Sequence, residues 1–477
     1  MMLQSGIMLR LQLLLLIVLF TSNVISLPAQ QNLKRAEDPA TDPFYQPPVG
    51  FEATAPGTVL RHRQIVSAFL GFIPDPIEAH QLLYRTTAID GSAIATVTTI
   101  FKPLFGFFKK DRYVSYHTAY DSSATICNPS YVFQAGSSQW GLIASLERFL
   151  IEIYLFLGYV VVSPDYEGPD VAFPVGRLEG MGVLDGMRAV NNYALELGFE
   201  TDNPMIVGTG YSGGAVATGW AAALHPTYAP ELNVVGWSQG GTPANLTGVV
   251  ETIDGTIFAG FLPTAIVGLS TPSAYGATLN PIIDSVISEE GRAALSFASR
   301  QCAVLGLLRF AGQELQDVDI QSLGKELLYH PTVQEVLQDC IIGIDPAETP
   351  SVPTFVYHAT KDEIIPYANA SSMVDRWCDA GADLKFTTYA AGGHATTLVL
   401  ALPAIFKFVE DAFAGTTGYS GCSRDTELTD MLDPLALGVD LEPVLVNLVN
   451  GLIMMGDADE NILHDLSILA ETLAGPA

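Results

Sequence analysis

Apolar residues along the chain form short, dense runs that alternate with longer helical segments. Residues 113–118 (YVSYHT) and 159–163 (YVVVS) are rich in β-branched and aromatic residues and end at turn signals, which predicts buried strands. Residues 145–156, between them, predict a helix. Strand, helix and strand in this order is typical of a parallel sheet, so we expect an α/β fold.

The alternation continues through the middle of the chain and then stops. Residues 178–197 predict a helix, residues 204–208 a short strand and residues 233–237 another strand. From about 244 to 350 the segments are helical, apolar and irregular, which indicates an insertion between strands. Strands and helices then resume, with strands at 354–358 and 385–389 and a closing helix at 396–413.

These patterns predict one catalytic domain with an insertion and an extension. Residues 36–243 and 351–422 would form a mostly parallel central sheet with helices on both faces, and residues 244–350 a mainly helical cap or lid. Residues 423–477 are acidic and have apolar residues at every third or fourth position, so we expect a C-terminal helical extension there.

The N-terminus predicts export. Arg10 is followed by the apolar residues 11–20 and then by small and polar residues up to Ser26, which is the pattern of a signal peptide over residues 1–26. Residues 27–35 would be a propeptide ending in the dibasic pair Lys34-Arg35. An uncleaved N-terminal anchor is the alternative. We expect a secreted, extracellular protein.

Composition and charge narrow the possible partners. The 477 residues are 49% hydrophobic and 15% charged, which is typical of a globular protein and not of a disordered one. The 51 acidic and 22 basic residues give a net charge of −29. Such a charge repels phosphate backbones and anionic membrane surfaces. Nucleic acid is therefore not expected as a partner, and stable membrane insertion is not expected because no later stretch of about 18 residues is uninterruptedly apolar.

The cysteines are five in number and widely spaced, at positions 127, 302, 340, 378 and 422. None of the spacings is that of a zinc site, so no metal is expected, and no motif calls for an organic cofactor. In an exported chain the simplest interpretation is two disulfides and one free thiol, with the pairing left open. Asn245 and Asn369 begin glycosylation sequons.

Gly210-Tyr211-Ser212-Gly213-Gly214 fits the pattern GxSxG. A strand precedes it and a helix rich in small residues follows it, which is the setting of a nucleophile elbow in an α/β-hydrolase. The flanking glycines allow a sharp turn, and the helix N-terminus directs amides at the reacting oxygen. A tight turn without catalytic function is the alternative. The pattern predicts Ser212 as nucleophile and the amide of Gly213 as an oxyanion donor.

A catalytic triad on this fold needs an acid and then a histidine on loops after later strands. Asp362 follows the strand at 354–358, and His394 follows the strand at 385–389. His358 is the competing base, but it lies within a strand and before the acid, while Glu363 is the alternative acid. We predict that His394 removes the proton of Ser212 and that Asp362 orients the imidazole.

Several further motifs resemble those of one family, the fungal secretory lipases (the Candida antarctica lipase A-like group of the α/β-hydrolase superfamily). The likeness covers nearly all of residues 40–422. It rests on seven motifs: Tyr120-Asp121-Ser122, Cys127-Asn128-Pro129-Ser130-Tyr131, Asp165-Tyr166-Glu167-Gly168, Gly210-Tyr211-Ser212-Gly213-Gly214, Tyr228-Ala229-Pro230-Glu231-Leu232-Asn233, Gly240-Gly241-Thr242-Pro243 and Asp362-Glu363-Ile364-Ile365-Pro366-Tyr367.

The resemblance implies the same triad of Ser212, Asp362 and His394, and adds Asp121 as the second oxyanion donor. A carboxylate would repel an oxyanion, but the main-chain amide of Asp121 or its protonated side chain could donate. The resemblance also implies disulfides Cys127–Cys302 and Cys378–Cys422, a buried free Cys340 and an acyl-binding tunnel in the cap.

The chain departs from the family at three places. Tyr120 replaces an acidic residue, Gly392-Gly393 replaces bulkier residues before the histidine, and an acidic tail after Cys422 replaces a Pro-rich flap. These differences concern substrate access and therefore the preferred acyl-chain length.

The expected function is that of a secreted serine lipase or carboxylesterase, which hydrolyses carboxylic esters of acylglycerols at an oil–water interface through an acyl-enzyme on Ser212. Three alternatives remain open: an esterase or acyltransferase acting on small or secondary-metabolite esters, a serine peptidase, and a catalytically dead homologue that binds lipid.

Overall fold

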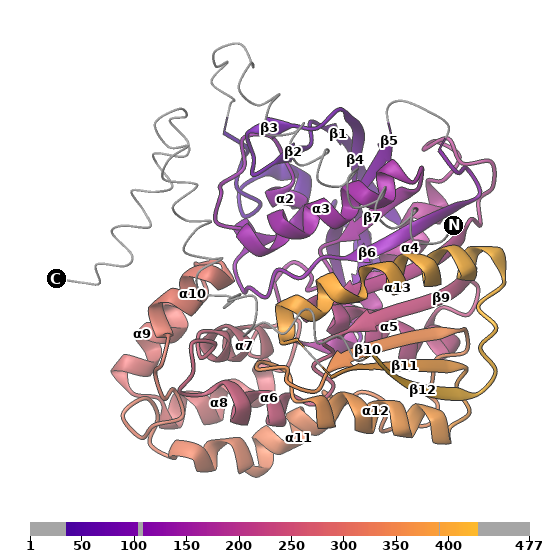
Figure 1. Cartoon of the computed structure of the whole chain (residues 1–477). Coiled ribbons are helices and arrows are strands. Elements are labelled where there is room, and N and C mark those ends of the chain that lie inside the picture. Colours follow the sequence, from indigo (N-terminus) through magenta and orange to yellow (C-terminus); the bar gives the residue numbers. More distant parts are fainter. Residues whose placement is uncertain (1–34, 104–107, 391, 428–477) are drawn as a thin grey trace, which may run out of the picture.

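A ten-stranded sheet forms the centre of the protein in the computed structural model, which describes residues 35–103, 108–390 and 392–427 (Figure 1). In spatial order its strands are β1 (Val59–Ile65), β4 (Ile77–Thr87), β5 (Ala93–Pro103), β7 (Val160–Pro164), β6 (Arg112–His117), β8 (Met205–Tyr211), β9 (Val234–Gly240), β10 (Thr354–Ala359), β11 (Leu384–Tyr389) and β12 (Cys422–Glu427). The expected signal peptide, nearly all of the propeptide and residues 428–477 lie outside the described residues.

The strands from β7 to β12 in this order pair in parallel. Every residue of β7 and of β10 is buried, which explains why these strands are continuous apolar or β-branched runs in the sequence. The fold is therefore α/β with a mostly parallel sheet, as predicted, and the six strands from β6 to β11 in chain order match the predicted ones to within a few residues.

The first part of the sheet is antiparallel and was not predicted. β4 and β5 pair over their full length of 11 residues, β1 adds to β4, and β5 joins the parallel part by pairing with β7. A small separate sheet holds β2 (Ala68–Phe69) and β3 (Ile73–Pro74). The sheet thus begins well before residue 113, where the sequence had indicated its start.

Helices cover both faces of the sheet. On one face, α3 (Leu142–Phe156) and α13 (His394–Ala414) lie against each other, with the rings of Tyr154 and Phe406 4.8 Å apart. The other face carries α4 (Gly176–Asn192), α5 (Gly213–Tyr228) and α12 (Tyr367–Asp379). A Cβ on Gly180 of α4 would lie 2.7 Å from the main chain of Trp220, so the approach of α4 to α5 requires glycine there.

A group of helices lies between β9 and β10 in the chain, to one side of the sheet (Figure 1). These helices are α6 (Leu246–Ile253), α7 (Phe261–Leu269), α8 (Gly276–Val286), α9 (Glu289–Ala298), α10 (Ala303–Phe310), η5 (Gly324–Tyr329) and α11 (Pro331–Asp339). They fall within residues 244–350, where the sequence indicated a helical insertion. No helix in the described ranges has the length and hydropathy of a membrane span.

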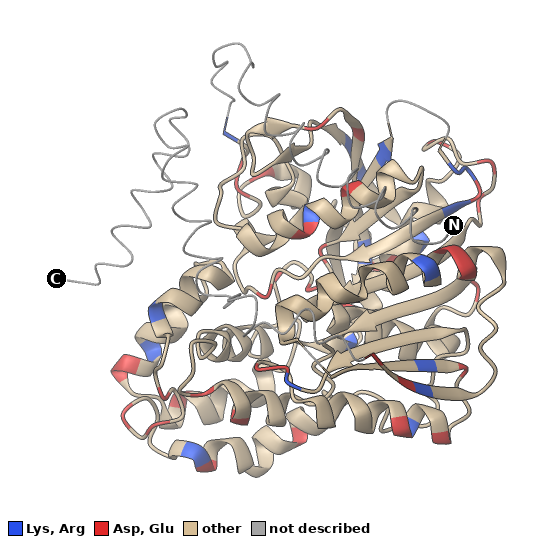
Figure 2. Cartoon of the chain, in the orientation of Figure 1, with Lys and Arg blue, Asp and Glu red and all other residues tan. Residues whose placement is uncertain are grey.

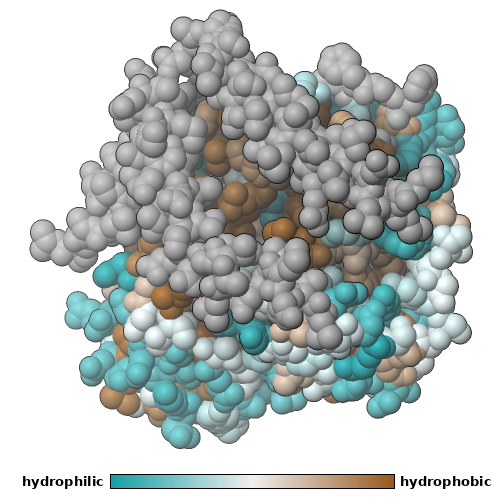
Figure 3. All heavy atoms as spheres, in the orientation of Figure 1, coloured by the Kyte–Doolittle hydropathy of each residue, from teal (hydrophilic) through white to brown (hydrophobic). Residues whose placement is uncertain are grey.

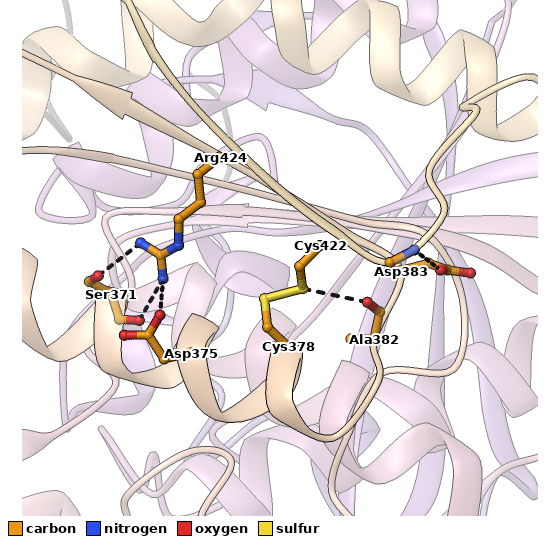
Figure 4. Close-up of a disulfide and its surroundings, with 8 residues drawn as sticks. Ser371, Asp375, Cys378, Ala382, Asp383, Cys422 and Arg424 are labelled. Carbon is orange, nitrogen blue, oxygen red and sulfur yellow. Dashed lines mark hydrogen bonds and ion pairs between the residues drawn. A yellow bond between two sulfur atoms is a disulfide. The ribbon is translucent and has the colours of Figure 1, made fainter.

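The last described strand corrects one predicted boundary. Residues 423–427 were assigned to a helical extension, but they belong to β12, which pairs with β11 from Cys422 to Glu427. This strand is polar and mostly exposed, so it lacks the apolar pattern of the other strands. Figure 4 shows what holds it instead: the disulfide Cys378–Cys422, and Arg424, whose guanidinium lies 2.5 Å from Asp375.

Candidate active site

Ser212 lies at the sharp turn between β8 and α5. Its φ of 55° and ψ of −121° are strained values for a residue with a side chain. A Cβ on Gly210 would lie 2.4 Å from the carbonyl oxygen of Gly214, and one on Gly214 would lie 1.9 Å from the carbonyl oxygen of His117. Both glycines are therefore required by the backbone, and the turn has the geometry of a nucleophile elbow.

Two hydrogen bonds connect Ser212, His394 and Asp362. Oγ of Ser212 is 2.8 Å from Nε2 of His394, and Nδ1 of His394 is 2.8 Å from Oδ2 of Asp362. Asp362 follows β10, and His394 is the first residue of α13. The other carboxylate oxygen of Asp362 accepts from the amides of Ile364 at 3.0 Å and Ile365 at 2.8 Å. The structure brings together the three residues that the sequence nominated as a triad.

The electrostatics of this pair favour a charged acid and a basic imidazole. Burial alone would raise the pKa of Asp362, but the nearby His394, the hydrogen bond to it and the Ile365 amide lower that pKa below its ordinary value. Burial alone would lower the pKa of His394, but the charge of Asp362 and their hydrogen bond raise it. Asp362 is thus suited to stabilise the imidazolium that forms when Ser212 loses its proton.

The main chain of His394 is also fixed. Its amide donates to Oε2 of Glu363 at 2.8 Å, and its carbonyl accepts from the hydroxyl of Tyr211 at 2.6 Å. A Cβ on Gly393 would lie 2.4 Å from Oε2 of Glu363, and Gly392 has a φ of 101°. Glycine at the two positions before the histidine therefore lets the loop pass close to Glu363 and turn into α13.

Asp121 lies beside the nucleophile, in the loop after β6. It is 5% exposed, its φ is 46°, and its Oδ1 has no hydrogen-bond partner in the described part of the chain. A Cβ on Gly213 would lie 1.7 Å from that Oδ1, so the carboxyl group stands directly over the first residue of α5. Burial, opposed by His394, raises the pKa of Asp121 to about 6.

A cavity of about 210 Å³ opens beside Ser212, Gly213 and Asp121. Its other walls are almost entirely apolar and come mainly from the helices between β9 and β10; they include Val250, Leu262, Ile283, Leu295 and Leu337. A cavity of this kind accepts a hydrocarbon chain and places its polar end at the reactive groups.

Similarity to known proteins fits this geometry. Residues 133–421, more than half of the chain, match the family model described as secretory lipase. The chain belongs to the secretory lipase family. A secreted triacylglycerol lipase of Malassezia furfur is 40% identical over 417 residues, which cover 87% of this chain and 83% of the relative. One from Malassezia restricta is 36% identical, covering 93% of this chain and 94% of the relative.

Solved structures of Candida antarctica lipase A show the same fold. In its closed state that lipase superposes with a TM-score of 0.74 at 30% identity, covering 86% of this chain and 95% of the other. The resemblance noted in the sequence is thus confirmed, and with it the α/β-hydrolase type of fold.

The disulfides of this secretory lipase join the pairs that the resemblance implied. Cys127–Cys302 ties the loop that follows β6 to the start of α10, and Ser122 of the same loop accepts a hydrogen bond from the amide of Ala303 at 3.0 Å. Cys378 is bonded to Cys422, and Cys340 is free and buried. The loop that carries Asp121 is therefore fastened to the helical region that lines the cavity.

Sequence reasoning missed the buried acids around Asp121. Glu147 accepts from the amide of Ala119 at 2.8 Å, whereas the carboxyl oxygens of Glu167 and Glu179 are buried without a hydrogen-bond partner among the described residues. Burial raises the pKa of all three glutamates, and for Glu167 the charges of Glu179 and Asp121 raise it further. The motif that contains Glu167 is recognisable in the sequence, but the burial of Glu167 near Asp121 is not.

The two glycosylation sequons lie next to each other. Asn245 caps α6 by accepting from the amide of Thr247 at 3.0 Å, and Asn369 of α12 lies 3.4 Å from the carbonyl of Asn245. Their glycosylation stays a prediction. In the described part of the lipase, no group of histidines, cysteines and acids is arranged to hold a metal ion.

Proposed function

We propose that this protein is a secreted lipase that hydrolyses the carboxylic esters of acylglycerols through an acyl-enzyme on Ser212. The observation that carries the proposal is the hydrogen-bonded series Ser212–His394–Asp362 at the polar end of an apolar cavity. The relatives named secreted triacylglycerol lipases support the substrate class and the extracellular location.

The first half of the reaction forms the acyl-enzyme. Nε2 of His394 accepts the Ser212 proton as Oγ attacks the ester carbonyl, and Asp362 stabilises the resulting imidazolium. The imidazolium then gives its proton to the departing alcohol. In the second half, water loses a proton to His394 and attacks the acyl-enzyme, which releases the acid and restores Ser212.

The oxyanion of each tetrahedral intermediate needs donors on the side away from His394. The amide of Gly213, at the N-terminus of α5, supplies one. Asp121 supplies the second, either from its main chain or from its carboxyl group when protonated. Its burial, its raised pKa and the lack of a partner for Oδ1 within the described chain support the protonated carboxyl group.

The helices from α6 to α11 would serve as the acyl-binding cap, with residues 36–243 and 351–427 as the catalytic domain. Because the cavity walls are apolar, a long acyl chain gains more burial than an acetyl group, which favours a lipase over an esterase for small esters. The intact Ser212–His394–Asp362 geometry argues against a catalytically dead lipid-binding protein.

An apolar surface on the face of the sheet that carries α3 and α13 supports action at an oil–water interface. The first part of α13, from His394 to Phe406, contains no Lys, Arg, Asp or Glu, and the charged residues of this helix lie in its later turns (Figure 2). Large apolar side chains are exposed on the same face of the sheet, namely Phe149, Phe156 and Val399. Figure 3 shows strongly hydrophobic residues near the middle of this face.

The test is hydrolysis of p-nitrophenyl esters from acetyl to palmitoyl by the purified protein and by Ser212→Ala. We expect activity that rises with acyl length and is lost in the variant. A preference for acetyl would favour the esterase alternative. Activity that survives in Ser212→Ala, or its absence with every ester, would overturn the mechanism.

A further inference from the structure

A second imidazole lies beside the acid of the proposed triad. His358, in β10, is fully buried, and its Nε2 is 3.3 Å from Oδ2 of Asp362. The same Oδ2 is 2.8 Å from Nδ1 of His394. One carboxylate oxygen therefore lies between two histidines, of which the proposed mechanism uses only His394.

The hydrogen bonds of His358 identify its protonation state. Its Nε2 is also 3.0 Å from the carbonyl oxygen of Ile365, which can only accept, so Nε2 carries the hydrogen. Its Nδ1 has no hydrogen-bond partner within the described ranges. Burial is the largest influence and lowers the pKa of His358, and nearby His394 lowers it further, against the opposing effects of Asp362 and Ile365. His358 is therefore a neutral imidazole that donates from Nε2.

Among the described residues, the groups around His358 offer no other charged partner. Asp362 and His394 face it from the two loops of the site, and the ring of Tyr367 in α12 packs 6.0 Å away. The Nε2–H thus donates to the Ile365 carbonyl, and the triad carboxylate lies beside the same nitrogen. The amides of Ile364 and Ile365 fix Oδ1 of Asp362, and Nε2 of His358 lies 3.3 Å from Oδ2.

We propose that His358 is a positioning residue. It holds Asp362 so that Oδ2 faces His394, and its N–H dipole partly offsets the negative charge on that oxygen. The proposal rests on the proposed function of Asp362. It has two consequences. Without the donor at position 358, the carboxylate of Asp362 is held less firmly toward His394, so turnover falls. The carboxylate also keeps more of its charge for His394, so the imidazolium is stabilised and the kinetic pKa of the base rises.

His358→Phe removes the donor and keeps a ring, whereas His358→Gln keeps an N–H donor of similar reach. His225→Phe is a matched control, because His225 is also buried, its Nε2 lies 3.3 Å from the carbonyl of Leu232, and its Nδ1 is also unpartnered in the described chain. His225 lies away from Ser212. The measurement is the pH profile of kcat/KM for p-nitrophenyl butyrate, expressed per active site titrated with an alkyl p-nitrophenyl phosphonate.

For His358→Phe we expect kcat/KM to fall roughly tenfold and the pKa of its acidic limb to rise by about 0.5. His358→Gln should restore most of the rate and the original pKa, and His225→Phe should change neither. An unchanged or lowered kinetic pKa in His358→Phe would overturn the proposal, even if the protein is less stable. If that variant does not fold, His358→Asn, whose amide is shorter, is judged by the same criterion.

Failure of the proposed function gives a different result. In that case the wild-type protein would not be labelled by the phosphonate at Ser212. Labelled wild-type protein with an unaltered His358→Phe profile would reject only the role of His358.

Discussion

Asp121 and Asp362 are both buried beside the nucleophile, yet their surroundings shift their pKa values in opposite directions. Asp362 accepts hydrogen bonds from the Ile364 and Ile365 amides and from His394, and its pKa is lowered. Oδ1 of Asp121 has no hydrogen-bond partner among the residues that the structure describes, and the pKa of Asp121 is raised to about 6. Burial raises the pKa of both aspartates, and the nearby His394 together with the hydrogen-bond donors outweighs it at Asp362 but not at Asp121.

This difference matches two different tasks. An ionised acid is needed beside the imidazole, where positive charge develops, whereas beside the ester oxygen, where negative charge develops, the carboxyl group of Asp121 donates only while protonated, at pH values below about 6. If the two aspartates have different functions, removing the charge of Asp362 and removing the carboxyl group of Asp121 should change activity and stability in separate, measurable ways.

The largest effect is expected from Asp362→Asn. An amide keeps the size of the side chain but cannot stabilise the imidazolium, and it permits the wrong tautomer of His394. We expect kcat/KM for p-nitrophenyl butyrate to fall roughly 1,000- to 10,000-fold, with the melting temperature measured as a control for folding. A loss of less than about tenfold would show that Asp362 is not the acid of the triad.

Asp121→Ala should have the next largest effect. If the protonated carboxyl group donates to the oxyanion, its removal should lower kcat roughly 100-fold with little change in KM. Asp121→Asn supplies a permanent N–H donor at the same place and should stay much closer to the wild type. Equal rates for the two variants would instead assign the donor to the main-chain amide of residue 121.

The same two aspartates should give the fold opposite dependences on pH. The pKa of Asp121 is raised in the folded state, so its contribution to stability is greatest at low pH and is lost as the pH rises through about 6. The pKa of Asp362 is lowered, so its contribution is present above the unfolded pKa and is lost as the pH falls.

Asp121→Asn removes the first of these dependences. It should therefore be more stable than the wild type at pH 8, by about 3 kcal/mol, and show no such gain at pH 4. Denaturant unfolding at the two pH values measures this difference. A gain of the same size at both would mean that ionisation of Asp121 is not its cause.

The smallest effect is expected at Glu363, which supports the main chain of His394 rather than its ring. Glu363→Ala removes the acceptor of the His394 amide and should lower kcat/KM only severalfold. Glu363→Gln retains an oxygen acceptor and should be near wild type. A loss from Glu363→Ala as large as that from Asp362→Asn would indicate that Glu363 is the acid instead.

The sequence predicted those parts of the fold whose burial leaves a pattern along the chain. Strands β6 to β11 are buried runs followed by turns, and the triad candidates Ser212, Asp362 and His394 come directly after three of them. Strand β12 was missed because it is polar and is held by Cys378 and Asp375, which are distant in sequence. The antiparallel strands β1, β4 and β5 precede the alternation of strands and helices that marked the parallel sheet.

The surroundings of the site could not be predicted, because they depend on contacts between distant segments. His358 appeared in the sequence only as a rival base, and its place behind Asp362 follows from the loop that returns at Ile365. Glu167 and Glu179 come from a loop and a helix whose packing puts both near Asp121. Apart from the family motif that contains Glu167, nothing in their local sequence distinguishes them from exposed acids.

The disulfide between Cys127 and Cys302 constrains how a substrate can enter. It closes a stretch of 175 residues and attaches the start of α10 to the loop after β6. That attachment persists in every conformation of the oxidised protein. Any motion that widens the entrance must therefore pivot about this end of the helical region and cannot lift the whole region away. The oxidising conditions of the export route thus determine the mechanics of the entrance as well as the stability of the fold.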